Sequence, residues 1–177
     1  VVLHATDPLT IELEARRLSD ETGQIFVSPY NDLDVIAGQG TCGLEIIDEA
    51  AIDSVFLSVG GGGLLSGVGA VLRTQCPNAE LVAVWPSNAQ SLLQSMKVGQ
   101  AVEVEEFPTL ADGTAGGVEP GSVTISLASR IAPSSLLVPA REIARAMSLL
   151  AREERLVVEG SAALAVAGLL SCSKSYE

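Results

Sequence analysis

Two kinds of apolar segment alternate along this chain. Short continuous apolar runs, with the composition of strands buried on both faces, occupy residues 54–59, 81–85 and 136–138. Elsewhere apolar residues recur at helical spacing, which predicts helices over residues 35–49, 64–74, 88–96, 122–131, 141–153 and 162–170. Strands that alternate with helices predict an α/β fold with a doubly wound, mostly parallel sheet and right-handed crossovers.

The first 27 residues predict one helix between two short strands. Residues 1–3 and 25–27 are short runs of strand-forming residues. Between them, Asp7 and Pro8 stand where an N-cap and a first helical residue belong, because Asp accepts hydrogen bonds from free amides and Pro lacks the donor. Leucines follow at helical spacing, and Gly23 stands where a C-terminal capping glycine belongs.

Three segments depart from the regular strand and helix patterns, two through their glycines and one through its acidic residues. The predicted helix 35–49 begins with an unusual number of glycines, which indicates close packing against another element. Residues 101–107 alternate apolar and acidic positions, which is typical of an exposed edge strand or an extended segment. Residues 111–121 are rich in glycine and predict a loop, and Ser161 can cap the alanine-rich helix 162–170.

Composition narrows the possible partners and the compartment. The 177 residues carry 22 acidic and 10 basic side chains, a net charge of −12, which excludes an electrostatic surface for nucleic acid or an anionic membrane. No apolar stretch is long enough to span a bilayer. Cys42, Cys76 and Cys172 are odd in number and widely spaced, so we expect a reducing, cytoplasmic compartment. The chain starts at Val1 in strand-like sequence, and both ends look cut, which predicts a part of a longer protein.

Four consecutive glycines join the strand 54–59 to the helix 64–74. Backbone amides without Cβ atoms can approach a ligand closely, and the helix that follows directs its free N–H groups and positive dipole end at the same place. This arrangement predicts a phosphate site. The alternative is a tight turn against a packed neighbour. The residues of the proposed anion cradle are Gly60, Gly61, Gly62, Gly63 and Leu64.

Two common phosphate ligands fit this loop poorly. After Gly61 and Gly63, the spacing of the next glycine departs from the Gly-x-Gly-x-x-Gly pattern of dinucleotide sites. The acid that would hold a ribose is also misplaced, because Glu80 precedes the next strand and Trp85 ends it. A triphosphate P-loop is excluded, because no Lys-Ser or Lys-Thr pair follows the glycines.

Five separated motifs resemble those of the fold-type II pyridoxal-phosphate enzymes, in particular the serine/threonine dehydratases and serine racemases. They occur in the family order and at family-like spacing, and the resemblance covers nearly the whole chain. Single motifs are weak, whereas the combination is specific. The motifs occupy residues 35–46, 59–64, 86–89, 111–113 and 158–161.

The resemblance implies a domain division and roles for the motif residues. Residues 1–27 would be the last helix and strand of a small domain, and residues 28–177 a large cofactor-binding domain. The cofactor would be pyridoxal 5′-phosphate, with its phosphate on the amides from Gly60 to Leu64. Gly113 would lie beside the pyridine ring. Glu159 would lie near the ring edge, the alternative being a carboxylate that stabilises a helix start.

The chain also departs from the family pattern. The Schiff-base lysine, found in a Ser-x-Lys-x-Arg context, is missing, so we expect no catalytic residue in this chain; the only lysines are Lys97 and Lys174. The loop for the substrate carboxylate and the C-terminal strand near the pyridine nitrogen are missing too. Trp85 and Ser91 stand where some relatives have acidic metal ligands, so we predict no metal there. His4 is the only histidine and is not expected to be a ligand.

The resemblance therefore implies part of a pyridoxal-phosphate-dependent ammonia-lyase that dehydrates serine- or threonine-type hydroxy amino acids. This part alone is expected to be inactive and to bind the cofactor weakly. One alternative is a serine- or aspartate-type racemase, which uses the same α-proton chemistry. Others are a non-catalytic truncated homologue that acts as a binding or oligomerisation module, and a dinucleotide-binding oxidoreductase fragment. The expected partners are a small amino acid and further copies of the chain, with no nucleic acid and no membrane.

Overall fold

A computed structural model describes residues 7–132 and 134–172. The predicted strand at residues 1–3, His4 and Lys174 lie outside the described residues. In chain order the helices and strands are α1 (Pro8–Thr22), α2 (Leu33–Glu49), β1 (Ser54–Ser58), α3 (Gly63–Gln75), β2 (Glu80–Pro86), α4 (Ser91–Val98), the 3-10 turn η1 (Asp112–Thr114), α5 (Val123–Ile131), β3 (Ser134–Val138), α6 (Ala140–Leu149), the π-helical turn η2 (Leu150–Glu154) and α7 (Gly160–Cys172).

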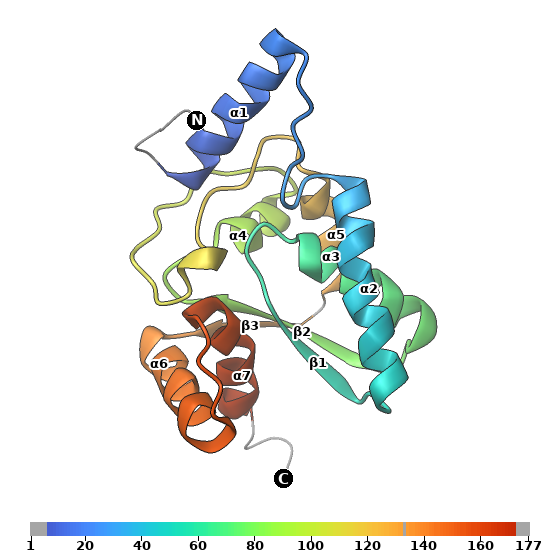
Figure 1. Ribbon diagram of the computed structural model, residues 1–177, viewed down its shortest axis with the longest axis vertical. Helices are drawn as coiled ribbons and strands as arrows, with labels where there is room; N and C mark the ends of the chain where they lie inside the picture. The colour runs from blue at the N-terminus through green and yellow to red at the C-terminus, as the bar shows by residue number, and fades with distance from the viewer. Residues whose placement is uncertain (1–6, 133, 173–177) are drawn as a thin grey trace.

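The three strands form one parallel sheet in the order β1-β2-β3 (Figure 1). Ser54 pairs with Glu80 at one end of the β1–β2 ladder, and Val82 pairs with Ser134 at the start of the β2–β3 ladder. Six of the seven residues of β2 are buried, which explains its continuous apolar sequence. The predicted α/β fold with a parallel sheet is confirmed.

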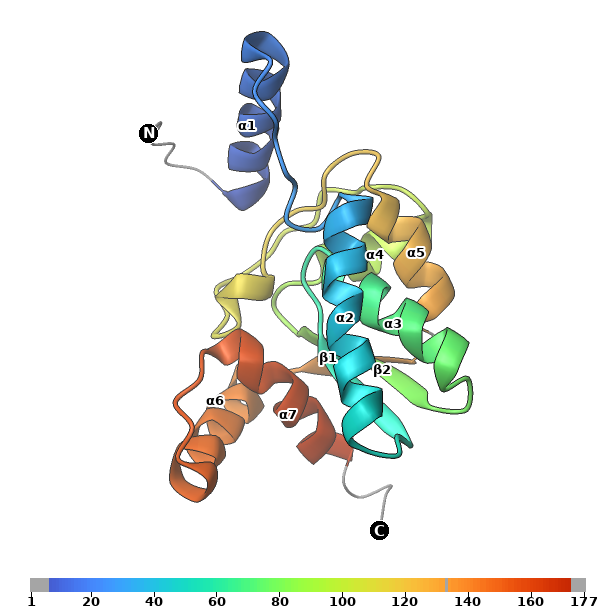
Figure 2. The ribbon, with the colours of Figure 1, turned by 45° about the vertical axis from the view of Figure 1, so that its right-hand side comes forward.

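Helices cover both faces of the sheet, so two separate cores form. On one face, side chains of α3 and α5 pack against Leu81, Ala83 and Trp85 of β2. On the other face, side chains of α6 and α7 pack against Val82 and Val84. Figures 1 and 2 show α6 and α7 together on one side of the strands and α2, α3 and α5 on the other. Alternate residues of one strand thus serve opposite cores.

Helices α2 and α3 approach each other through glycine, as the glycine-rich start of α2 predicts. A Cβ atom at Gly67 would lie 2.3 Å from the Ile36 carbonyl oxygen and 2.6 Å from the Gly40 amide nitrogen. A Cβ atom at Gly43 would lie 3.1 Å from the Val71 side chain. Because α3 carries the glycine loop at its start, this backbone contact fixes the loop relative to α2.

Helix α1 has the predicted caps but lies apart from the sheet. The Asp7 carboxylate accepts a hydrogen bond from the Thr10 amide at 3.2 Å, and Gly23 ends the helix at φ 69°. The helix buries no residue completely, and Figures 1 and 2 show it at one end of the molecule. A domain boundary between residues 27 and 28 stays a prediction.

Two local predictions are wrong. Residues 25–27 form no strand: they pair with no described strand, and Ile25 is 92% exposed, so nothing satisfies a strand's backbone groups. The helix predicted over residues 141–153 ends at Leu149 and continues as the π-helical turn η2. Residues 101–107 form an extended segment without strand pairing, which is one of the two predicted possibilities. No helix among the described residues is both long and apolar enough to cross a membrane.

Candidate functional site

The four glycines lie at the C-terminal end of β1 and open helix α3. Gly62 is the N-cap at φ 90°, and no side chain caps the helix. Within the described residues, no amide from Gly60 to Leu65 donates a hydrogen bond to protein; the first turn begins with Ser66 N donating to Gly62 O at 2.9 Å. A helix start with unused N–H donors and its positive dipole end is suited to an anion.

This loop forms one wall of a cavity of about 670 Å³. The facing walls come from residues 112–117 and from the first turn of α7, more than forty positions further along the chain. Such a volume is typical of sites for small ligands and cofactors. The cavity brings together every site residue predicted from the sequence, namely Gly60, Gly61, Gly62, Gly63, Leu64, Gly113 and Glu159.

The wall opposite the glycine loop combines a bare backbone with two polar side chains. A Cβ atom at Gly113 would lie 2.9 Å from the Ser161 hydroxyl oxygen and 3.8 Å from Glu159 Oε1. Gly113 therefore leaves room that any other residue would fill. Ser161 was predicted to cap helix α7, which is wrong: the helix begins at Gly160, and Ser161 lies inside its first turn.

Two cavity-lining serines have buried hydroxyl oxygens without a partner. Ser58 Oγ and Ser161 Oγ make no hydrogen bond within the described residues, although both are shielded from solvent. A buried hydroxyl without a partner costs about 1–3 kcal/mol, so folded proteins rarely keep two in one cavity for packing alone. A polar ligand in the cavity would relieve this cost. The sequence did not predict that Ser58 and Ser161 would line the cavity with hydroxyls that have no partner among the described residues. For Ser58, its place just before the glycines was the available signal.

The glycines also satisfy a packing requirement. A Cβ atom at Gly61 would lie 2.4 Å from the Tyr30 ring, and one at Gly62 would lie 2.6 Å from the Leu92 side chain. The alternative explanation of a turn against packed neighbours therefore holds at these two positions. It does not compete with anion binding, because the neighbours occupy the Cβ positions and leave the N–H groups without acceptors.

The charged side chains that line the cavity are acidic. They are Glu12, Asp112 and Glu159, and no Lys or Arg is among the described lining residues. Burial raises the pKa of Glu12; a hydrogen bond with Tyr30 opposes this, and the negative charge of Glu119 adds to it. A phosphate bound here would therefore be held mainly by neutral donors, above all the backbone amides that open α3.

Neighbouring polar residues hold the loop before α2. Gln39 Nε2 donates to the Pro29 carbonyl of that loop at 3.1 Å, whereas Thr41 Oγ1 donates to Gly38 O at 2.7 Å within α2. Gln39 also lines the cavity, which the sequence reasoning did not anticipate. Tyr30 lines it as well, and no local sequence pattern indicated this residue.

Trp85 and Ser91 lie where the resemblance would place acidic metal ligands. Trp85 is 1% exposed in the sheet core, and Ser91 Oγ donates to Glu106 Oε1 at 2.6 Å. No group of three or more His, Cys, Asp or Glu side chains within residues 7–132 and 134–172 is arranged to hold a metal ion. That this chain binds no metal stays a prediction.

Known proteins resemble this chain along its whole length. A family model described as "Pyridoxal-phosphate dependent enzyme" matches residues 1–177. The chain is 40% identical to L-threonine ammonia-lyase of Thermotoga maritima over 158 residues, which cover 89% of this chain and 39% of that protein. It is 34% identical to the catabolic L-threonine dehydratase TdcB of Escherichia coli K12 over 172 residues, 97% of this chain and 52% of that protein.

Solved structures show the same likeness. The processed form of threonine deaminase isoform 2 from Solanum lycopersicum matches with a TM-score of 0.86 and 33% identity, over 93% of this chain and 45% of that one. Maize serine racemase matches with a TM-score of 0.83 and 28% identity, over 94% of this chain and 50% of that one. The chain thus spans about half the length of the relatives it matches.

Proposed function

Because this chain belongs to the family of pyridoxal-phosphate-dependent enzymes, we propose that its cavity binds pyridoxal 5′-phosphate. We further propose that the complete protein is an ammonia-lyase of serine- or threonine-type hydroxy amino acids. The observation that carries the proposal is the row of amides from Gly60 to Leu65, which open α3 and have no acceptor within the described protein. The relatives at 34–40% identity are named for threonine, which favours the dehydratase over the racemase.

The residues of the cavity fit this cofactor. The amides from Gly60 to Leu64 would bind the phosphate, and Gly113 would leave space for the ring. Glu159 would face the ring edge, and the Ser161 hydroxyl would gain the partner it lacks. When bound, pyridoxal phosphate supplies an electron sink for chemistry at the α-carbon of an amino acid. This chain's contribution is to bind, orient and enclose that group.

The proton transfers of the reaction need a lysine, and none of the described residues that line the cavity is a lysine. Lys97 lies on α4, where its Nζ donates to Gln94 Oε1 at 3.3 Å, and it does not line the cavity. We therefore infer that the lysine belongs to the remainder of a longer protein, together with most of a small domain. On this view residues 1–27 belong to that small domain and residues 28–177 form the large one.

Leu64 offers a clean test of the phosphate site. It lines the cavity in the first turn of α3, where an acidic residue favours the helix but repels an anionic ligand. In the complete protein, stripped of cofactor, Leu64→Asp is expected to weaken pyridoxal 5′-phosphate binding roughly tenfold or more, since like charges a few ångströms apart cost on the order of 1–4 kcal/mol. Leu64→Asn is the matched neutral control.

Equilibrium dialysis measures both affinities, and thermal unfolding shows whether each variant is folded. If a folded Leu64→Asp variant binds as tightly as Leu64→Asn, the glycine loop is not the phosphate site. The reaction is tested separately with the complete protein and L-threonine or L-serine. Keto acid and ammonia support the ammonia-lyase, the D-amino acid supports a racemase, and cofactor binding without either product supports a non-catalytic binding module.

Two further expectations concern the protein as a whole. Gel filtration of the complete protein is expected to show a homo-oligomer, and a monomer would contradict this. A reducing, cytoplasmic location is proposed from the cysteines, all three of which have free thiols. Localisation of a tagged complete protein would test it.

A further inference from the structure

Tyr30 supports the glycine loop from behind. Its ring occupies the space beside Gly61, where a Cβ atom would lie only 2.4 Å away. Its backbone lies beside the next turn, because a Cβ atom at Gly63 would lie 3.1 Å from the Tyr30 Cα. Tyr30 is 7% exposed and lines the same cavity as the glycines. A shift of this ring would therefore move the amides proposed to bind phosphate.

The Tyr30 hydroxyl is held by Glu119. The Glu119 amide donates a hydrogen bond to Tyr30 Oη at 2.9 Å, across 89 positions of sequence. Gln39 holds the backbone next to Tyr30, because its Nε2 donates a hydrogen bond to the Pro29 carbonyl at 3.1 Å. Tyr30 is thus held at the neighbouring backbone of Pro29 and at the tip of its own side chain.

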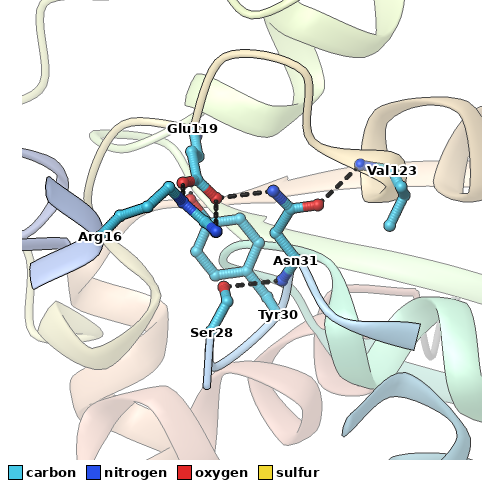
Figure 3. Close-up of polar contacts among 6 residues, drawn as sticks. All are labelled: Arg16, Ser28, Tyr30, Asn31, Glu119 and Val123. Atoms are coloured by element: carbon cyan, nitrogen blue, oxygen red, sulfur yellow. Dashed lines mark hydrogen bonds and ion pairs between the residues drawn. The ribbon is translucent and has the colours of Figure 1, made fainter. Parts of the chain in front are cut away.

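The Glu119 carboxylate in turn holds helix α1. It is 3% exposed and accepts two hydrogen bonds from the Arg16 guanidinium, the one from Nη2 to Oε2 being 2.9 Å long. Asn31 Nδ2 donates to the same Oε2 at 2.6 Å, and Asn31 Oδ1 accepts from the Val123 amide at 3.0 Å. Figure 3 shows Arg16 of α1 and Asn31 of the loop before α2 converging on Glu119, with Val123 at the start of α5 joined to Asn31.

The network keeps a buried charge paired. Burial alone would raise the pKa of Glu119, but the hydrogen bonds from Arg16 and Asn31 and the Arg16 charge lower it below its ordinary value. Glu12 of α1 is the other acidic group that faces Glu119 and Tyr30. Two-point pairing between a guanidinium and a carboxylate fixes both groups in direction as well as distance. The position of α1 therefore sets the position of Glu119.

We propose that Tyr30 is a positioning residue for the phosphate-binding loop, and that the Arg16–Glu119 ion pair transmits the position of α1 to it. The inference rests on the proposed function, because it assigns the loop to phosphate. It adds that α1, at the far end of the molecule from α7, helps to set the phosphate affinity. Neither residue touches the reacting atoms.

The test compares pyridoxal 5′-phosphate with pyridoxal, which lacks the phosphate, in the complete protein. The ratio of the two affinities reports the phosphate loop alone, whereas general damage to the fold lowers both affinities together. Tyr30→Phe removes the hydroxyl and keeps the ring, and Arg16→Gln removes the ion pair. Each is expected to lower the affinity ratio roughly fivefold and to leave pyridoxal binding within about twofold of the wild type.

Arg17→Gln is the matched control. Arg17 neighbours Arg16 on α1 and pairs with Glu14 and Glu21 on the helix surface, so the substitution also breaks ion pairs but does not reach Glu119. It is expected to leave the ratio unchanged. If Arg16→Gln fails to fold, Arg16→Lys keeps the charge while losing the two-point geometry, and it is expected to lower the ratio in the same direction.

The outcomes separate this inference from the proposed function. A wild-type protein that binds both compounds equally, or neither, overturns the phosphate site and this inference with it. A wild type that prefers the phosphate, with Tyr30→Phe and the Arg16 variant retaining the full preference, overturns the positioning role alone. Equal losses of both affinities make the network purely structural and also overturn it.

Discussion

Gly113 lies so close to Ser161 that a Cβ atom at position 113 would come within 2.9 Å of the Ser161 hydroxyl oxygen. That oxygen is buried, and it has no hydrogen-bond partner among the described residues. The loop at residues 112–117 and the start of α7 thus form one wall of the cavity. This wall has no side chain at Gly113 and a hydroxyl group beside it at Ser161. The glycine loop faces this wall across the cavity.

Gly113→Ala is predicted to weaken pyridoxal 5′-phosphate binding about tenfold or more while changing stability by less than about 1 kcal/mol. The stability effect is small because the clashing atom ends a short side chain that can rotate. The added methyl group still occupies the space proposed for the ring. Equilibrium dialysis and thermal unfolding measure the two effects.

The double variant Gly113→Ala with Ser161→Ala distinguishes two causes. If the methyl group obstructs the ring, the double variant binds the cofactor clearly more weakly than Ser161→Ala alone. Full recovery to that level would mean that the loss came from displacement of Ser161, and Gly113 would lose its proposed place beside the ring.

Ser161→Ala alone is predicted to act in opposite directions on stability and binding. Removing a buried hydroxyl that lacks a partner should stabilise the cofactor-free protein by up to about 1 kcal/mol. Removing a donor that the cofactor would use should weaken pyridoxal 5′-phosphate binding roughly fivefold. Denaturant unfolding and dialysis of the same preparation check both; a destabilised protein with unchanged affinity would contradict the role.

Gly67→Ala is predicted to destabilise the protein by about 3 kcal/mol, because its Cβ atom would lie 2.3 Å from the Ile36 carbonyl oxygen and neither backbone can move freely. The matched control is Gly38→Ala on the exposed side of α2, where a Cβ atom meets nothing within 4 Å. That change should stabilise the helix by about 0.5–1 kcal/mol. Urea unfolding gives both values, and similar effects for the two variants would argue against the close α2–α3 contact.

Glu119→Gln is predicted to lower stability at neutral pH by about 1–2 kcal/mol, a value reduced because Arg16 is partly exposed. The folded pKa of Glu119 lies below its ordinary value of 4.5. Its contribution is therefore complete above pH 4.5 and is lost as the pH falls below that value through the folded pKa.

The measurement is the midpoint of thermal unfolding for wild type and variant from neutral pH to strongly acidic pH. The difference between them is expected to be largest near neutral pH and to shrink on acidification, because protonation removes the charge in the wild type. Glu12, whose pKa is raised by burial and also by the negative charge of Glu119, titrates in both proteins, so the comparison uses the neutral and strongly acidic ends of the range, where Glu12 carries the same charge in both. A difference that stays constant with pH would show that Glu119 is not a paired carboxylate in solution.

The sequence by itself determined the α/β class, the alternation of elements and the place of the glycine loop between β1 and α3. These features depend on neighbours in the chain: strand composition, capping residues such as Asp7 and Gly23, and four glycines between a strand and a helix. Gly113 and Glu159, which the family resemblance singled out, both line the cavity opposite the glycine loop.

Only the tertiary structure decided which distant groups meet. Tyr30 and Glu119 are 89 positions apart, and nothing local marks either of them. The same holds for the unpartnered hydroxyl of Ser161 and for the backbone contact at Gly67. Residues 25–27 have strand-forming composition but find no described neighbour to pair with. Hydrogen bonds and close packing depend on the position of the partner, and that position is set by the packing of the sheet and helices rather than by any one segment.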